Sequence, residues 1–280
     1  MNKRITVIPN DKAAGVQAAL PAVCAALRDL GAEVILPRQP EAFNGDMIDE
    51  ALRSGDAAVA LGGDGTIIHI AKRAARFERA VLGINCGNLG FMAGLETDEL
   101  PALSALMDGT YGIDSRMMLS VRVRQEGRPD REFFALNEAV VARGPLSRMI
   151  AMDIANNGQP VISYHADGVI VSTPTGSTAY SLSAGGPIVD PAVKGLLMTP
   201  ICPHSLHSRA YIFREDAVLS VRSSGPDGDN VFLTVDGEDG VALTEADTVE
   251  IGRAEQTARL ITIKPQPFYE ILHRKLMDRR

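Results

Sequence analysis

Apolar and polar residues follow two different rhythms along the first hundred residues. Short apolar runs, typical of buried β-strands, stand between longer stretches in which apolar residues recur every three or four positions, as on one face of a helix. Strands are predicted at residues 5–9, 33–36, 57–61 and 80–84, and helices at residues 16–30 and 66–75. Alternating strands and helices predict a Rossmann-like α/β domain, in which helices cover a mostly parallel sheet.

The predicted helix at residues 16–30 carries the clearest apolar stripe, but it contains a proline. The stripe consists of Val16, Leu20, Val23, Leu27 and Leu30. Pro21 lacks an N–H group, so it either kinks this helix or moves its start. Gly31 follows the last apolar position and is suited to cap the C-terminus of the helix.

A different rhythm begins near residues 108–109. Short strand-like runs follow one another, separated by turn clusters such as residues 156–158, and this pattern predicts an all-β, sandwich-like domain. These strands are expected at residues 116–124, 132–136, 139–143, 149–154, 161–164, 169–172, 217–221, 231–235, 247–251 and 260–263. We expect an α/β domain at 1–108, a β-rich domain at 109–265, and a charged C-terminal helix within 266–280 that packs on the first domain.

Composition and charge narrow the classes of function. The chain has 280 residues, of which 45% are apolar and 22% charged, as in a globular protein large enough for two domains. Its net charge of −7 argues against nucleic acid as a partner, because nucleic-acid binding needs a basic surface. An anionic small molecule is compatible with this charge, since backbone N–H groups can bind phosphate on an acidic protein. No apolar run approaches the ~20 residues of a membrane span, so no membrane partner is expected.

The cysteines and the N-terminus favour a cytoplasmic location. Cys24, Cys86 and Cys202 are odd in number, far apart and without the CxxC spacing of zinc sites, so we expect three reduced thiols. The apolar run that follows Arg4 is too short for a signal peptide.

The first chemically distinctive motif is Gly62-Gly63-Asp64-Gly65-Thr66, between the predicted strand at 57–61 and the predicted helix at 66–75. Glycines let backbone N–H groups approach phosphate oxygens, and the start of a helix adds a partial positive charge. A carboxylate among such donors would repel a bound anion, so Asp64 needs a separate task. It can hold Mg²⁺, or it can accept a proton from an attacking hydroxyl group. The alternative is a tight strand-to-helix turn with Asp64 in a turn position.

A second loop, rich in glycine and asparagine, covers residues 83–91 after the predicted strand at 80–84. Open α/β sheets bind ligands beyond the carboxyl ends of their strands, so both loops are expected on one edge of the sheet. The dehydrogenase fingerprint G-x-G-x-x-G does not follow the first strand, where the chain instead reads Pro9-Asn10-Asp11-Lys12.

Two further segments stand out in the β-rich half. Asn137 and Glu138 interrupt a strand-like region, and an amide beside a carboxylate can read a purine edge or a ribose hydroxyl, although a bulge or turn explains the pair equally well. Residues 167–187 are dense in glycine and hydroxyl residues, with five Ser or Thr between 172 and 178. Helix capping uses some of these hydroxyls, but one cap does not need five. Tyr180 is suited to lie against an aromatic base.

These motifs together resemble the signature motifs of the NAD kinase family, in family order and over nearly the whole chain. Residues 176–180 discriminate most, because the first motif is shared with phosphofructokinases and with diacylglycerol and sphingosine kinases. The resemblance implies an α/β domain and a β-sandwich-like domain, with NAD in the cleft. It implies that ATP and NAD give ADP and NADP, with the γ-phosphoryl group moved to the 2′-hydroxyl of the adenosine ribose. It also implies Mg²⁺ or another divalent metal, and a homotetramer or homodimer.

The resemblance also implies roles for single residues. Asp64 matches the family's proposed general base, and Gly62, Gly63, Gly65 and Thr66 match its phosphate loop. Positions that match NAD-binding residues are Asp64, Gly65, His69, Asn137, Glu138, His165, Asp167, Thr178, Ala179, Tyr180, Ser181, Leu182 and Ser183. His69 and His165 stand where the family often has a basic residue, so any positive charge there depends on pH. The pattern assigns no set of metal ligands.

Two rival functions share part of this pattern. A lipid kinase of the diacylglycerol or sphingosine type would share the first motif, but it needs an apolar acceptor groove, which the hydroxyl-rich residues 172–183 do not predict. A non-catalytic NAD(H) or NADP sensor would bind dinucleotide without turning over ATP, and an acid such as Asp64 in a phosphate-type loop argues against it.

Overall fold

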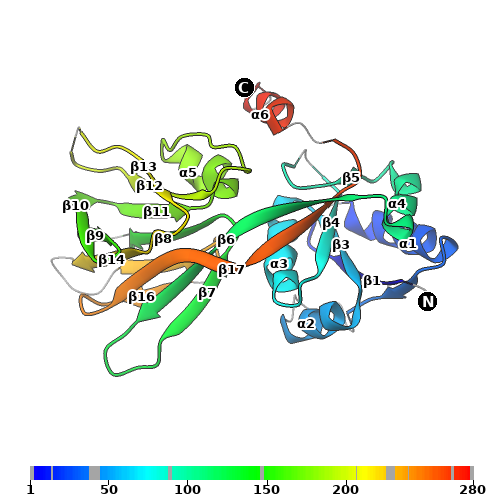
Figure 1. The fold of residues 1–280 in the computed structure, drawn as a ribbon, viewed down its shortest axis with the longest axis horizontal. Helices are drawn as coiled ribbons and strands as arrows, with labels where there is room; N and C mark the ends of the chain where they lie inside the picture. The colour runs from blue at the N-terminus through cyan, green and yellow to red at the C-terminus, as the bar shows by residue number, and fades with distance from the viewer. Residues whose placement is uncertain are drawn as a thin grey trace. The chain divides into compact units, whose positions relative to one another are not determined.

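The computed structural model describes residues 3–13, 15–37, 45–87, 90–145, 148–205, 207–224, 231–238, 240–265 and 268–277. The chain forms two compact units (Figure 1). Unit 1 comprises Met1–Ser115 and Ala258–Arg280, and unit 2 comprises Arg116–Thr257. The chain therefore leaves unit 1 and returns to it for its last segment, so that unit 1 is discontinuous in sequence.

Unit 1 is built on a parallel sheet with the strand order β17-β4-β3-β1-β2. The strands are β1 (Arg4–Pro9), β2 (Glu33–Ile35), β3 (Ala57–Gly62), β4 (Ala80–Asn85) and the end of β17 (Thr248–Thr262), and a short β5 (Leu95–Glu96) pairs with β4. Every residue of β3 and β4 is buried, as in a sheet that helices cover on both faces. Since β2 lies on one side of β1 and β3 on the other, the strand order reverses at β1. Sheets of this kind bind ligands at such a switch point.

Helices cover both faces of this sheet. α1 (Val16–Asp29), η1 (Leu100–Leu103) and α4 (Ser104–Asp108) contribute to one core with the side chains of Ile5, Val7, Val59 and Leu82. α2 (Gly45–Ser54) and α3 (Asp64–Ala75) contact each other, and α3 packs on β3 and β4. Gly83 allows this close packing, because a Cβ there would stand 2.4 Å from the Ile67 side chain of α3.

The structure tests two predictions for α1, the effect of Pro21 and the cap at Gly31. The helix runs from Val16 through Pro21, so the proline does not move its start. The glycine cap is confirmed, since Gly31 has a φ of 83° and its N–H donates to the carbonyl of Arg28 at 2.9 Å. The next N–H, of Ala32, donates to the carbonyl of Leu27 at 3.0 Å, which completes a Schellman motif.

Unit 2 is the sandwich-like β domain that the sequence predicts. One sheet has the order β13-β12-β11-β8-β15-β16, and the other contains β10-β9-β14-β17 with β6 and β7. Side chains from both sheets, including Val171, Leu233, Ile154 and Val221, share one core. The elements are β6 (Gly112–Arg124), β7 (Arg131–Ala135), β8 (Glu138–Arg143), β9 (Ile150–Asn156), β10 (Gln159–Ala166), β11 (Gly168–Ser172), η2 (Thr175–Thr178), α5 (Tyr180–Ser183), β12 (Gly195–Ile201), β13 (Tyr211–Arg214), β14 (Leu219–Ser224), β15 (Val231–Val235) and β16 (Val241–Leu243).

Strand β17 differs from the sequence prediction. Two strands are expected at 247–251 and 260–263, because Glu255 and Gln256 interrupt the apolar alternation, but the structure has one strand of 15 residues. Both polar residues are exposed, so the strand continues where the alternation stops. The end of this strand pairs with β4 of unit 1, with Arg259 opposite Ala80. The predicted β-rich domain extends to residue 265, whereas unit 2 ends at Thr257.

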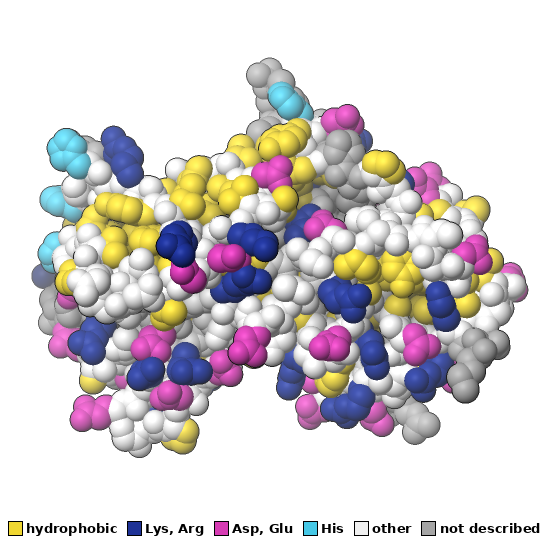
Figure 2. All heavy atoms as spheres, viewed as in Figure 1, with side chains coloured by type: hydrophobic (Ala, Val, Ile, Leu, Met, Phe, Trp, Pro, Cys, Tyr) yellow, Lys and Arg dark blue, Asp and Glu magenta, His cyan; other side chains and the backbone are white. Residues whose placement is uncertain are grey.

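The surface carries both signs of charge. On the face shown in Figure 2, basic and acidic side chains are interspersed. None of the helices within the described ranges is long and apolar enough to cross a membrane.

Candidate functional site

The glycine loop, residues 62–66, joins β3 to α3, and a hydrogen bond from the end of β1 holds it. The Asn10 amide, which follows β1, donates to the Thr66 hydroxyl at 2.8 Å. Gly62 has a φ of 155°, and a Cβ there would stand 2.4 Å from that hydroxyl. The glycine at position 62 is therefore required by the fold of the loop itself.

Gly63 and Gly65 are glycines for a different reason. Within the described parts of the chain, nothing lies within 4 Å of the place where a Cβ would stand at either position. Protein packing therefore does not require glycine there, whereas a ligand that approaches the backbone closely would. Both residues flank Asp64 at the N-terminus of α3, where the helix end favours an anion.

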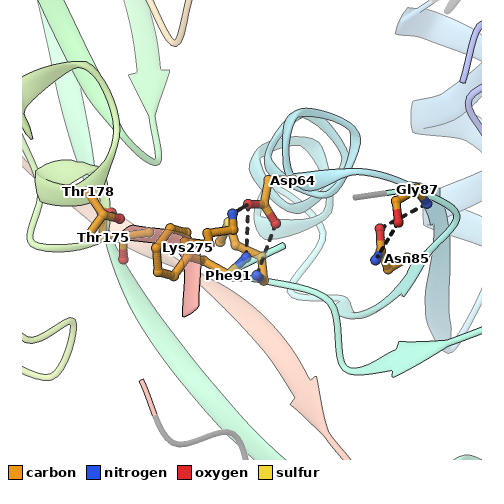
Figure 3. Close-up of polar contacts among 8 residues, drawn as sticks. Asp64, Asn85, Gly87, Phe91, Thr175, Thr178 and Lys275 are labelled. Carbon is orange, nitrogen blue, oxygen red and sulfur yellow. Dashed lines mark hydrogen bonds and ion pairs between the residues drawn. The ribbon is translucent and has the colours of Figure 1, made fainter. Parts of the chain in front are cut away.

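The Asp64 carboxylate is held by three donors, which Figure 3 shows. Its Oδ2 accepts the backbone N–H of Phe91 at 2.9 Å and the Lys275 ammonium at 3.0 Å, and its Oδ1 accepts the N–H of Met92 at 3.1 Å. Gly90 permits this approach, because a Cβ there would stand 2.3 Å from Oδ1. The loops after β3 and β4 thus meet at one sheet edge, as predicted.

The loop after β4 is itself anchored. Asn85 donates to the Glu96 carboxylate at 2.8 Å and accepts the N–H of Gly87 at 3.2 Å. Asn88 and Leu89 of the predicted loop lie outside the described residues.

Lys275 belongs to the C-terminal helix, α6 (Phe268–Met277). Its ammonium lies 4.0 Å from the centroid of the Phe91 ring, and Phe268 of the same helix lies 6.3 Å from that ring. The sequence patterns did not point to Lys275, because 211 residues separate it from Asp64. A lysine in a charged terminal helix has no distinguishing spacing.

This loop fits a divalent metal that Asp64 and substrate phosphate oxygens would bind together. In proteins, Mg²⁺ usually takes one or two carboxylates and completes its shell with water and substrate phosphates. Among the described residues, no three or more His, Cys, Asp or Glu side chains form a metal cluster. The single carboxylate of Asp64, 26% exposed and beside the open glycine positions, suits a metal that phosphate oxygens also bind.

In unit 2, Asp236 organises the predicted Asn137-Glu138 pair. Its carboxylate accepts the N–H groups of Leu136 at 2.8 Å, Asn137 at 2.9 Å and Glu138 at 3.0 Å. In return, the N–H of Asp236 donates to the carbonyl of Glu138 at 2.9 Å. The sequence patterns missed Asp236, because 98 to 100 residues separate it from these partners.

Glu138 is a buried acid with an open acceptor. The residue is 8% exposed, and its Oε2 has no hydrogen-bond partner among the residues that the structure describes. Burial and the nearby Asp236 carboxylate raise the pKa of Glu138 to about 7, against the effect of a Tyr180 backbone N–H that donates to it. The buried oxygen is suited to a ligand hydroxyl.

The shifted pKa of Glu138 predicts a pH-dependent stability. The folded protein keeps this proton between about pH 4.5 and about pH 7, where the unfolded chain has lost it, so the free energy of unfolding falls as pH rises through this window. Glu138→Gln cannot titrate. The stability of this variant relative to wild type is therefore expected to rise by about 2.5 kcal/mol between about pH 5 and about pH 8. Denaturant unfolding of both proteins at the two pH values measures it, and an unchanged difference would contradict the shift.

The hydroxyl-rich loop packs directly on the Asn137-Glu138 pair. The N–H of Thr173 donates to the Asn137 carbonyl at 2.9 Å, and its hydroxyl donates to the Leu136 carbonyl at 2.6 Å. Gly176 has no room for a side chain, because a Cβ would stand 2.2 Å from the Asn137 carbonyl oxygen. Residues 137, 138 and 173–180 therefore form one local structure.

Several hydroxyls of this loop bind within the protein. The buried Ser177 hydroxyl donates to the Val189 carbonyl at 3.1 Å, and the buried Ser181 hydroxyl pairs with that of Thr199 at 2.9 Å. Packing therefore explains part of the Ser and Thr density. The surface left for a ligand includes Tyr180, which is 45% exposed. Ser183 is also exposed, and Thr178, Ala179 and Leu182 are partly buried.

Three further predicted residues, Asp167, His165 and His69, have other surroundings. Asp167 accepts a hydrogen bond from Arg143 at 2.6 Å, and this bond raises the pKa of the Arg143 guanidinium. His165 is exposed on β10, and His69 is partly buried in α3. The predicted site residues thus fall into one group in unit 1, around Asp64, and another in unit 2.

Comparisons with known families agree on both units. Residues 17–111 match the family model for the ATP-NAD kinase N-terminal domain, and residues 136–263 match that for the ATP-NAD kinase C-terminal domain. The NAD kinase of Symbiobacterium thermophilum is 45% identical over 222 residues, 79% of this chain and 78% of the relative. The NAD kinase of Solibacter usitatus is 38% identical over 273 residues, 96% of this chain and 94% of the relative.

Two solved structures resemble the chain along its length. A yeast NADH kinase complexed with NADH has a TM-score of 0.86 at 23% identity, covers 99% of this chain and is itself covered to 88%, a likeness of fold. An NAD kinase from Archaeoglobus fulgidus in complex with ATP has a TM-score of 0.78 at 25% identity, with 98% of each chain covered.

Proposed function

The chain belongs to the NAD kinase family, and from this premise we propose that it transfers the γ-phosphoryl group of ATP to the 2′-hydroxyl of the adenosine ribose of NAD. The products are ADP and NADP. The observation that carries the proposal is the glycine loop, in which two positions without packing constraints flank a carboxylate held by three donors.

Phosphoryl transfer is mainly a matter of positioning and charge stabilisation. The backbone at Gly63 and Gly65 and the N-terminus of α3 are proposed to bind the triphosphate. Asp64 is proposed to accept the proton of the ribose 2′-hydroxyl, or to hold Mg²⁺. When bound, Mg²⁺ supplies positive charge against the phosphate oxygens.

The dinucleotide is proposed to bind to the local structure around Glu138 in unit 2. The free Oε2 of Glu138 offers an acceptor for a ribose hydroxyl, and the exposed Tyr180 ring offers a surface for a base. The other NAD-binding residues implied by the family resemblance, including Asn137 and Asp167, stay proposals on the same footing.

One assay tests the proposed function against its rivals. The purified protein is incubated with Mg-ATP and NAD, and NADP and ADP are quantified. Equal amounts of both products are expected. ADP formation that depends on an added lipid acceptor would favour the lipid kinase, and tight binding of dinucleotide without ADP would favour the sensor.

Alanine substitutions at Gly65 and at Gly62 are expected to cause different defects, one in substrate binding and one in stability. Gly65→Ala is expected to keep the thermal stability of wild type but to raise the KM for Mg-ATP about tenfold, because its Cβ takes space that only the ligand needs. Gly62→Ala, the matched control, is expected to lower stability instead, because its Cβ meets Thr66. Steady-state kinetics and thermal unfolding of both variants separate the two effects. A stable Gly65→Ala enzyme with normal KM would remove this loop from phosphate binding.

Assembly and location are also proposed on the family premise. We expect a homotetramer or homodimer, measured by light scattering, and a cytoplasmic location consistent with three free cysteines at Cys24, Cys86 and Cys202.

A further inference from the structure

Asp64 poses an electrostatic problem for the proposed function. A triphosphate must bind beside this carboxylate, and two negative groups at close range repel each other. The two backbone N–H groups that hold the carboxylate carry no net charge. Lys275 is the charged donor of the three, so it is the group in this cluster that offsets the negative charge.

The ammonium of Lys275 lies where it can offset the charge of Asp64. It lies 3.0 Å from Asp64 Oδ2 and 4.0 Å from the centroid of the Phe91 ring, whose face attracts cations. The Lys275 side chain is 22% exposed and that of Asp64 26% exposed. The pair is therefore less screened by water than an ordinary surface ion pair.

The same contact fixes the orientation of the carboxylate. Phe91 contributes its N–H to Asp64 and its ring to Lys275, so one residue holds both charged groups. Phe268 lies against the same ring and attaches the start of α6 there. Of the three donors to Asp64, the lysine side chain is the one that can turn to another partner without a change of the backbone.

We propose that Lys275 is a positioning residue for phosphoryl transfer, which acts through Asp64. It neutralises and orients the carboxylate so that the glycine loop accepts a metal-bound triphosphate. This role rests on the proposed function and assigns to α6 a part in the chemistry of unit 1.

Lys275→Met tests the proposal, because it keeps the length of the side chain and removes the charge. Mg-ATP binding, measured by calorimetry, is expected to weaken about tenfold, while the KM for NAD stays within about twofold. Lys275→Arg is expected to retain most of the binding, because it keeps the charge. Arg274→Met is the matched control: it removes a cation from the next position of α6, where the side chain is exposed, and it is expected to change neither value.

A double-mutant cycle separates a role through Asp64 from a structural role. In the Asp64→Asn background there is no carboxylate charge to offset, so Lys275→Met is expected to weaken Mg-ATP binding by less than about twofold. Equal weakening in both backgrounds would overturn the proposal, since Lys275 would then bind the triphosphate itself or support the fold. Faster turnover of Lys275→Met would also overturn it and identify the contact as a restraint.

The wild-type assay keeps this inference apart from the proposed function. If wild type forms no NADP, the proposed function fails. If wild type forms NADP and Lys275→Met binds Mg-ATP and turns over as wild type does, the role of Lys275 fails alone. Circular dichroism and thermal unfolding of each variant confirm that the comparison is made on folded protein.

Discussion

Replacing Asp64 by asparagine is expected to lower the turnover of NADP formation by at least about 100-fold, and by up to about 10,000-fold, the usual range for removing a general base. Dinucleotide binding should remain largely intact, because most of its proposed residues, including Glu138 and Tyr180, lie in unit 2. In the wild type, each carboxylate oxygen accepts a backbone N–H group. The asparagine amide has an NH₂ group in place of one of these oxygens, and this group faces a donor, so the side chain loses its orientation as well as its charge. Steady-state kinetics with NAD-binding titrations measure both effects.

Asp49→Asn is the matched control for Asp64→Asn. The Asp49 carboxylate also lies in unit 1, but it accepts from Arg73 at 2.9 Å and Arg76 at 3.0 Å, at the other end of α3 from the glycine loop. It should affect stability without a comparable loss of turnover. If Asp64→Asn needs much more Mg²⁺ for half-maximal activity, Asp64 mainly holds the metal; near-normal turnover would remove it from the chemistry altogether.

Asp236→Ala is expected to have the largest effect on stability, roughly 3 kcal/mol or more. Its carboxylate satisfies three consecutive backbone N–H groups, and each donor left unpaired in a buried place costs about 1–3 kcal/mol. The segment that holds Asn137 and Glu138 would also lose its conformation, so the KM for NAD should rise. Denaturant unfolding and kinetics at saturating Mg-ATP measure the two effects.

Asp216→Ala provides the comparison for a surface carboxylate. Asp216 pairs with Arg214 at 2.8 Å, but its side chain is 63% exposed, and such pairs contribute about 0–1 kcal/mol. A loss for Asp236→Ala no greater than that for Asp216→Ala would mean that water or another group replaces the lost acceptor. The proposed organising role of Asp236 would then be wrong.

Local patterns predicted the parts of the fold whose neighbours are close in sequence. The strands β1, β3 and β4 are short apolar runs, and the turn after α1 is set by Gly31. α2 was not predicted, although Ile48, Ala51 and Leu52 have helical spacing, because three positions are too few to define a stripe. β12 was not predicted either: six of its seven residues are buried, so it shows no alternation, and it contains a proline.

The candidate site also has parts that local sequence predicts and parts that it does not. The glycine loop and the Asn137-Glu138 pair are contiguous motifs, and the sequence is enough to select them. The groups that hold them, Lys275 and Asp236, come from distant parts of the chain, and nothing in their local sequence predicts those contacts. Only folding brings Lys275 to Asp64 and Asp236 to the Asn137-Glu138 pair, so these supporting contacts are found from the structure and not from the sequence.

The discontinuity of unit 1 has a consequence for synthesis of the protein. A ribosome makes β1 to β4 first, but the strand segment that pairs with β4, and the helix that carries Lys275, are made last. Unit 2 has a core of its own and lies wholly before these segments in the chain. Unit 2 is therefore complete in the chain before unit 1, unlike the usual order in which the N-terminal part of a nascent chain is completed and folds first. A chain that stops at Thr257 contains every residue of unit 2, but its glycine loop lacks the lysine that holds Asp64.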